Sequence, residues 1–110
     1  MKILLVEDDI MLNEMITEYL TSTGHAIISA KTGLQSLEIL EKEKFDLLIL
    51  DINLPDIDGF TILEKMHEQK RMIPTIYISA LIDIEEISRA FDLGCFDYLK
   101  KPFFIDELEI

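Results

Sequence analysis

Polar side chains that could do chemistry follow four short apolar runs of this sequence. They are Glu7, Asp8 and Asp9 after residues 2–6, Asp51 after 47–50, Ser79 after 75–78, and Lys100 and Lys101 after 96–99. Two or three carboxylates at one place would repel one another unless a hard divalent cation such as Mg²⁺ held them together. A lysine, a serine and a lone carboxylate beside that cation supply what a phosphoryl group needs, namely charge neutralisation, a hydroxyl donor and a nucleophilic oxygen.

The elements that must position these residues alternate between strand and helix, which is typical of a parallel sheet built from βα units. Apolar runs predict strands at 2–6, 26–30, 47–50, 75–78 and 96–99. Helical spacing of apolar residues predicts helices at 10–21, 34–40 and 60–69, a fourth between 83 and 94, and the start of a fifth at 106–110. Right-handed crossovers would bring the carboxyl ends of the strands, with their polar residues, to one edge of the sheet.

The same spacing predicts which helical residues face the sheet. They are Met11, Met15, Ile16, Tyr19 and Leu20 in the first helix, Leu34, Leu37, Ile39 and Leu40 in the second, Ile62, Leu63 and Met66 in the third, and Ile84 and Phe91 in the fourth, with Ile87 at the edge of that stripe. Local signals predict the helix ends. They are a capping box of Thr32 and Gln35, a cap at Asp83 with Glu86, and glycine stops at Gly24 and Gly94.

Asp51 closes the most apolar run of the chain, so it is expected at the carboxyl edge of a central strand, where ligands bind in open α/β sheets. A simpler interpretation is that Asp51 only opens the following loop. Likewise Glu7 to Asp9 could be a solvated run that caps a helix. The presence of suitable groups at four strand ends at once favours a functional site.

Composition limits the class of protein. A chain of 110 residues with 49% hydrophobic content fits one compact domain. A net charge of -12 disfavours direct binding to nucleic acid or an anionic membrane and favours cations and basic partners. The first apolar run is too short for a signal peptide or a membrane span, so a cytoplasmic protein is expected. The single cysteine, Cys95, is interpreted as a core residue, and His25 and His67 as structural or surface residues.

Further residues stand at characteristic places around the strand ends. They are Pro55 and Gly59 after Asp51, Ala80 after Ser79, Tyr98 in the last strand, and Pro102 after Lys101. With Glu7 and Asp8, this set resembles the receiver domain of bacterial two-component response regulators over essentially the whole chain. The resemblance implies a flavodoxin-like, doubly wound, five-stranded parallel sheet of order 2-1-3-4-5 in three α/β/α layers, with a truncated fifth helix. Lys101, not Lys100, matches the family lysine because it precedes the proline.

The resemblance also implies a mechanism. A histidine kinase or a histidine phosphotransfer protein would present a phosphohistidine, and Asp51 would attack its phosphorus in line to form an acyl phosphate. Asp8 would bind Mg²⁺ directly and Glu7 through water, with Asp51 and the backbone carbonyl of Asn53 as further ligands. Such a protein is a phosphoacceptor that catalyses its own phosphotransfer and autodephosphorylation, not a conventional enzyme.

The family's remaining roles fall on strands four and five. Lys101 would pair with a phosphoryl oxygen, and its bond to Pro102 would be cis. Ser79 would bind another phosphoryl oxygen, and its movement would let Tyr98 swing from an exposed to a buried position. Phosphorylation would thus bias a two-state element that controls an output.

Two positions depart from relatives that carry winged-helix DNA-binding domains. Glu107 matches an acid that pairs across a dimer with a base on the fourth helix, but Ile87 stands at the place of that base. Phe96 replaces one acid of the usual pair in strand five and leaves Asp97. A homodimer through the fourth helix, fifth strand and fifth helix therefore stays an open expectation.

The expected output is transcription regulation by an attached DNA-binding domain, with residues 1–110 as the N-terminal part of a longer protein. One alternative is a stand-alone or hybrid-kinase receiver that acts by protein–protein interaction. Another is a phosphatase of the haloacid dehalogenase type, although Asn53 stands where that class needs a second aspartate. A third is an interaction module that has lost phosphorylation, which the presence of Asp51, Asp8 and Lys101 opposes.

Overall fold

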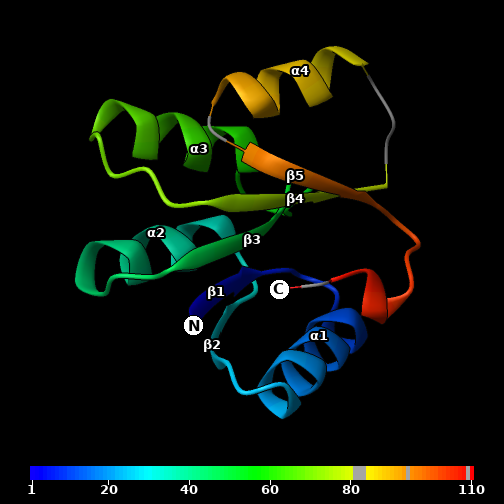
Figure 1. Cartoon of the computed structure of the whole chain (residues 1–110). Helices are drawn as coiled ribbons and strands as arrows, with labels where there is room; N and C mark the ends of the chain where they lie inside the picture. Colours follow the sequence, from blue (N-terminus) through cyan, green and yellow to red (C-terminus); the bar gives the residue numbers. More distant parts are fainter. Residues whose placement is uncertain (81–83, 94, 109) are drawn as a thin grey trace.

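The computed structural model describes residues 1–80, 84–93, 95–108 and 110, and its described part has the predicted fold (Figure 1). Parallel strands form one sheet in the order β2-β1-β3-β4-β5, which confirms the predicted fold class and order. The strands are β1 (Lys2–Val6), β2 (Ala26–Ala30), β3 (Leu47–Asp51), β4 (Thr75–Ser79) and β5 (Cys95–Lys100). The helices are α1 (Ile10–Ser22), α2 (Gly33–Lys42), α3 (Gly59–Glu68) and α4 (Ile84–Asp92), followed by the 3₁₀ turn η1 (Ile105–Glu107).

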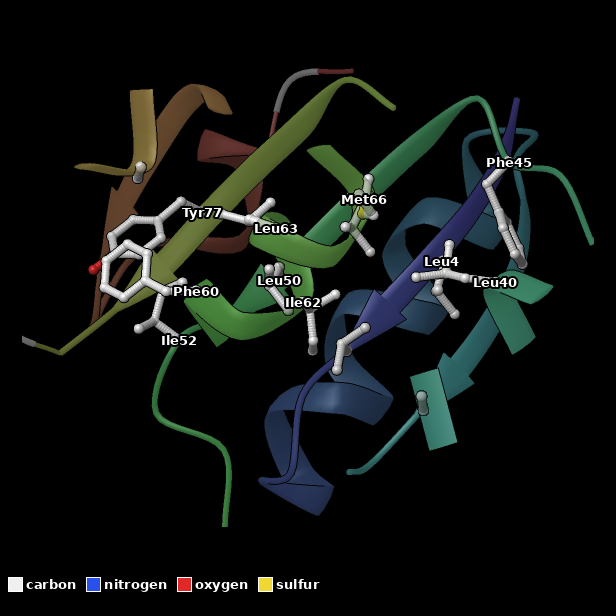
Figure 2. Packing of buried hydrophobic residues seen from close by; sticks show 14 residues of the cluster. Leu4, Leu40, Phe45, Leu50, Ile52, Phe60, Ile62, Leu63, Met66 and Tyr77 are labelled. Atoms are coloured by element: carbon white, nitrogen blue, oxygen red, sulfur yellow. The ribbon is translucent and has the colours of Figure 1, made fainter. Parts of the chain in front are cut away.

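Both faces of the sheet are covered. Helix α1 and the turn η1 lie on one face, and helices α2, α3 and α4 lie on the other (Figure 1). In β1, Leu4 and Val6 pack toward α2 and α3 while Ile3 and Leu5 pack toward α1, and all four are fully buried. Because both faces are covered, the strands are continuous apolar runs and do not alternate between apolar and polar residues. Figure 2 shows the cluster under α2 and α3.

The inner face of α3 is as predicted, because Ile62, Leu63 and Met66 are buried. The inner face of α1 is partly wrong. Ile16 and Leu20 are buried together with Asn13, but Met11 and Met15 are 73% and 52% exposed. Each residue turns the helix by about 100°, so the two methionines lie nearly opposite Asn13 around the helix axis. The side of α1 that carries Asn13 and the side that carries the methionines therefore cannot both face the sheet.

The same correction applies to Leu34, Ile84 and Phe91, which were expected to face the sheet and are exposed. Helix α4 packs through Ala90, with Ile87 half-buried beside it. Ile84 and Phe91 lie about 100° or more around the helix from Ala90 and point outward, 80% and 47% exposed. Helical spacing identified an apolar stripe on each helix, but the neighbouring elements cover a different side of the helix.

The predicted helix ends at Thr32 and Gly24 fall on described residues. Thr32 Oγ1 accepts from the Gln35 N–H, although Gln35 reaches back to the Lys31 N–H and not to that of Thr32. Gly24 has a φ of 98° just beyond the end of α1, as expected of a glycine stop. The helix predicted at 106–110 is wrong, because the described residues form only η1 and then bury Leu108 against the α1 side of the sheet.

The predicted cap at Asp83 and stop at Gly94 lie outside the described residues, as does the side chain of Cys95. His67 is exposed on α3, and His25 Nδ1 lies 3.0 Å from the amino group of Met1, so both histidines are surface or structural residues as expected. In the described ranges, the helices are too short or too polar to cross a membrane.

Candidate functional site

Three carboxylates meet at the carboxyl edge of the sheet, as the sequence predicts. Strands β1 and β3 are neighbours, with Val6 beside Leu50, so the residues that follow them are brought together. One oxygen from each of Glu7, Asp8 and Asp51 lies within 4.8 Å of the others. Glu7 and Asp51 are buried and Asp8 is exposed, so this cluster opens to solvent on one side.

Lys101 completes what we call the acidic site, which consists of Glu7, Asp8, Asp51 and Lys101. Its ammonium Nζ lies 2.6 Å from Glu7 Oε1 and 3.1 Å from Asp51 Oδ2. The Lys101 N–H donates to the Ser79 carbonyl at 2.7 Å, and the Lys101–Pro102 peptide bond is cis. Lys100 is exposed at the end of β5, so Lys101 is the lysine that reaches the carboxylates.

Ser79 and Asn53 border the acidic site on the β4 side. The Asn53 N–H donates to Asp51 Oδ1 at 3.0 Å, and the Asn53 side-chain amide donates to Ser79 Oγ at 3.3 Å. Ser79 is fully buried at the end of β4. All four strand ends named in the sequence analysis therefore contribute to one place.

Burial and like charge perturb the site. Burial, together with the hydrogen bond to Asp51, raises the pKa of Glu7 to about 8, although Lys101 acts in the opposite direction. Burial alone would lower the pKa of Lys101, but the hydrogen bond with Glu7 and the charge of Asp51 outweigh it and raise that pKa. Three carboxyl groups thus share one ammonium, so an added cation would favour the ionised form of Glu7 and would be stabilised here.

One buried oxygen points to such a cation. Glu7 Oε1 is buried, and the close partner that the described part of the chain gives it is the Lys101 ammonium, 2.6 Å away. Lys101 also contacts Asp51, so an ion can supply the further partner that this buried carboxylate calls for. Carboxylate oxygens are the hard oxygen donors that Mg²⁺ prefers, so Glu7, Asp8 and Asp51 fit this ion.

Asn13, which was not predicted to take part in the site, supports the acidic turn from α1. Its side-chain amide donates to the Glu7 carbonyl at 3.0 Å, and its Oδ1 accepts from Ser29 on β2. The available signal was a polar residue on the otherwise apolar inner face of a helix. Asp9 proved to be the cap of α1, accepting from the Leu12 N–H at 3.1 Å, so one part of the simpler interpretation of Glu7 to Asp9 is correct.

A second set of side chains lies beside the site, on strands β4 and β5 and at the start of α3. The rings of Phe60, Tyr77 and Tyr98 form what we call the aromatic stack, with centroid distances of 5.9 Å for Phe60–Tyr77 and 5.3 Å for Tyr77–Tyr98. Figure 2 shows Phe60 and Tyr77 side by side next to Ile52. Tyr98, the expected switch residue, is half-buried here. The Tyr77 hydroxyl lies 3.5 Å from Glu86 on α4, so the stack contacts that helix.

A groove of about 500 Å³ opens next to Lys101. Its walls include Met11 and Met15 of α1 on one side and Pro102 and Phe103 on the other. The two methionines that the sequence analysis placed in the core therefore line a surface beside the acidic site.

Comparisons with known proteins agree with this geometry. A family model described as the response regulator receiver domain matches residues 3–110. The transcriptional regulatory protein CrdR of Helicobacter pylori is 39% identical over 109 residues, covering 98% of this chain and 51% of that protein. The Francisella response regulator 1452 receiver domain matches with a TM-score of 0.91 at 31% identity, covering 97% of this chain and 88% of that one. TrrA of Thermotoga maritima, in complex with Mg²⁺ and BeF, matches with a TM-score of 0.84 at 28% identity, covering 97% and 91%.

The chain spans about half the length of CrdR and of the other curated transcriptional regulators that it matches, between 47% and 52%. The similarity to these regulators therefore concerns only the part that this chain covers.

Proposed function

The chain belongs to the family of response regulator receiver domains, and on that basis we propose that Asp51 accepts a phosphoryl group from a phosphohistidine. Receiver domains interact with histidine kinases or histidine phosphotransfer proteins, and either would supply the donor. A carboxylate oxygen of Asp51 attacks the phosphorus in line, the phosphorus–nitrogen bond breaks, and the electron pair returns to the imidazole of the donor. The observation that carries this proposal is the contact of Lys101 Nζ with Asp51 Oδ2 beside two further carboxylates.

Lys101 and Ser79 bind the transferred group. The Lys101 ammonium is already 3.1 Å from Asp51 Oδ2, so a short movement lets it pair with a phosphoryl oxygen on that carboxylate. The Ser79 hydroxyl reaches a second oxygen, which requires Ser79 Oγ to leave the Asn53 amide that donates to it at 3.3 Å. Both side chains act by position and charge, as expected for phosphoryl transfer.

Mg²⁺ is the proposed cofactor. Asp8, Asp51 and the Asn53 carbonyl would hold it directly and Glu7 through water, a set that agrees with the excess of buried negative charge. The chemistry that Mg²⁺ supplies when bound is neutralisation of the phosphoryl oxygens. The presence of Mg²⁺ and BeF in the TrrA complex supports this assignment by similarity.

The groove beside Lys101 is the proposed approach of the phosphodonor. It is lined by exposed apolar side chains of α1, Met11 and Met15, directly next to the lysine that contacts Asp51. A partner helix with an apolar face could place its phosphohistidine over the acidic site from this side.

The proposed output follows Ser79 and Tyr98. Withdrawal of Ser79 toward the phosphoryl group would let Tyr98 move further into the stack, and β5 with α4 would present the changed surface. The exposed apolar residues there are Ile84 and Phe91, so a homodimer or a partner would contact these and not the half-buried Ile87. Control of transcription by an attached DNA-binding domain is the output that the similarity to CrdR supports.

Intact mass tests this function directly. Incubation with acetyl phosphate and Mg²⁺ should add the mass of one phosphoryl group to the wild-type chain and none to Asp51→Asn. A chelator should prevent the gain in the wild type. Phosphorylation of Asp51→Asn to the wild-type extent would refute the assignment of the phosphoacceptor.

A further inference from the structure

The loop that follows β3 is tied to helix α2 by a carboxylate that the proposed chemistry does not use. Asp56 Oδ1 accepts from the Gly33 N–H and Asp56 Oδ2 accepts from the Leu34 N–H, each at 2.8 Å. These bonds join positions 22 and 23 residues apart in the chain. Hydrogen bonds to a carboxylate are stronger than those between neutral groups, and two of them fix the orientation of the side chain as well as its place.

The first turn of α2 is an electrostatically suitable partner for Asp56. The first N–H groups of a helix lack partners within the helix, and the positive end of its dipole attracts an anion. Thr32 accepts from the Gln35 N–H, and Asp56 accepts from the N–H groups of Gly33 and Leu34. The N–H groups of the first turn of α2 are therefore satisfied partly by the residue before the helix and partly by the loop. The bond from Leu34 is the main cause of a lowered pKa for Asp56, which agrees with a favourable ionised state.

An apolar contact fixes the same loop independently. Ile57 lies so close to Gly33 that a Cβ added at Gly33 would come within 2.2 Å of Ile57 Cγ1. Ile57 is half-buried and packs on the core under α2 and α3. A glycine at the start of α2 is therefore what allows the loop to rest on the helix.

The other end of the loop carries Asn53 into the acidic site. The Asn53 N–H donates to Asp51 Oδ1, and only Leu54 and Pro55 separate Asn53 from Asp56. On the far side of Asp56, Asp58 caps α3 through the Phe60 N–H at 2.7 Å. The path of residues 53–57 thus depends on few anchors. Leu54 and Ile57 pack on the core, and the hydrogen bonds of Asp56 to α2 are a polar anchor three residues after Asn53.

We propose that Asp56 is a positioning residue of the acidic site: it anchors the loop on α2 and thereby fixes the backbone of Asn53 next to Asp51. The inference rests on the proposed function insofar as the Asn53 carbonyl is a Mg²⁺ ligand. Helix α2 becomes part of the apparatus that shapes the site, although no residue of α2 belongs to the acidic site itself.

Two substitutions at the same helix end separate positioning from stability. Asp56→Ala removes the loop anchor, while Thr32→Ala removes the helix cap and leaves the loop anchor in place. Both should lower the urea midpoint of unfolding, because each leaves N–H groups of α2 without a partner. Only Asp56→Ala should weaken Mg²⁺ binding in a calorimetric titration, by about tenfold, the lower end of the loss found when groups that orient metal ligands are removed. Asp56→Asn, which keeps one acceptor oxygen, should recover part of the affinity.

A second measurement needs no metal. The Asn53 amide should exchange its hydrogen faster in Asp56→Ala than in the wild type or in Thr32→Ala, since its bond to Asp51 opens when the loop is released. Gly33→Ala should have the same effect by pushing Ile57 away while Asp56 is still present.

The outcomes distinguish this proposal from the proposed function. If the wild type binds Mg²⁺ and is phosphorylated, but Asp56→Ala matches Thr32→Ala in both affinity and Asn53 exchange, Asp56 has only a structural role and the inference is wrong. If the wild type neither binds Mg²⁺ nor accepts a phosphoryl group, the proposed function fails. Exchange at Asn53 then still decides whether Asp56 positions the loop.

Discussion

The acidic site and the aromatic stack lie side by side at the sheet, yet burial has opposite effects on them. In the acidic site, the carboxyl groups of Glu7 and Asp51 are buried with one lysine between them, and burial raises the pKa of Glu7 to about 8, which disfavours its ionised form. In the aromatic stack, Tyr77 is fully buried between two rings and gains from apolar contact. The acidic site lowers the stability of the fold because it holds carboxyl groups together. The aromatic stack beside it raises that stability.

This difference predicts that substitutions in one region will change the free energy of unfolding and substitutions in the other will change the rate of phosphorylation. The largest loss of stability is expected in the aromatic stack. Tyr77→Ala should lower the free energy of unfolding by about 3–5 kcal/mol, because it removes a large buried ring. The folded fraction should still be phosphorylated at close to the wild-type rate. Urea denaturation and acetyl phosphate labelling at low urea measure the two effects.

Tyr77→Phe is the matched control, since it keeps the ring and loses the contacts of the hydroxyl with Glu86 and Ser79. Its loss of stability should stay below about 1.5 kcal/mol. Loss of phosphorylation in folded Tyr77→Ala would contradict the separation of the two regions.

The opposite result is expected in the acidic site. Asp8→Asn should slow phosphorylation more than about 100-fold, because it removes a proposed charged metal ligand and even outer groups can contribute 10–100-fold. The free energy of unfolding should not fall, since the substitution relieves repulsion within the cluster. Mass spectrometry over time and urea denaturation provide the two values.

Asp9→Asn controls for charge at the adjacent position. Asparagine also caps helices well, so both stability and phosphorylation should stay near the wild-type values. Equal rates for Asp8→Asn and the wild type would refute the assignment of Asp8.

The two regions also differ in how far the sequence predicts them. Polar residues at the strand ends, namely Glu7 to Asp9, Asp51, Ser79 and the pair Lys100 and Lys101, were predicted to converge because parallel topology brings such positions to one edge. That argument needs only the order of elements, whereas the choice of Lys101 over Lys100 came from the family resemblance. The outward position of Ile84 and Phe91 depends on which side of α4 finds room above the sheet, and helical spacing alone does not contain this information.

Polar side chains that bind the backbone of another element were missed for a related reason. Asn13 is recognisable as a polar residue on an inner helical face, but its partner is the backbone of Glu7. Asp56 lies in a turn where aspartate is common, and its partners on α2 are 22 and 23 residues away. Backbone N–H groups carry no sequence signal, so such contacts become visible only once the helix and the loop are placed.

The comparison extends to the surface, where the stack side exposes apolar residues on α4. If activation acts through this face, beryllofluoride with Mg²⁺ should promote weak self-association or partner binding, and Phe91→Ser should weaken it by about 1 kcal/mol or more, as at other apolar interface positions. Sodium chloride should have little effect, because an apolar contact is screened less than an ion pair. Sedimentation with and without beryllofluoride measures the change.

Met72→Ser is the matched control for Phe91→Ser. Met72 is 43% exposed against 47% for Phe91, but it lies in the segment before β4 and not on α4. If both substitutions weaken the association of the activated protein equally, the association is non-specific hydrophobic contact and does not depend on α4. An activated protein that stays monomeric and free of partners, with Tyr98 unmoved, would count against this output face.

The smallest effect is expected for the pH dependence of stability at Asp56. Its measurement tests whether a carboxylate near the acidic site contributes to the free energy of unfolding. The pKa of Asp56 is lowered from 3.8, chiefly by the hydrogen bond from Leu34, so the ionised form is favoured in the folded state. A group whose pKa is lower in the folded state contributes stability that is complete above its unfolded pKa and is lost as pH falls through the folded pKa. The difference in free energy of unfolding between the wild type and Asp56→Ala should therefore be constant from about pH 5 to pH 7 and shrink below pH 3.8. Taking the difference cancels the titration of Glu7, because Asp56 has no contact with it and independent sites add. Urea denaturation of both proteins across this range measures the effect, and a difference that grows toward low pH would show that the Asp56 carboxylate is not stabilised by α2.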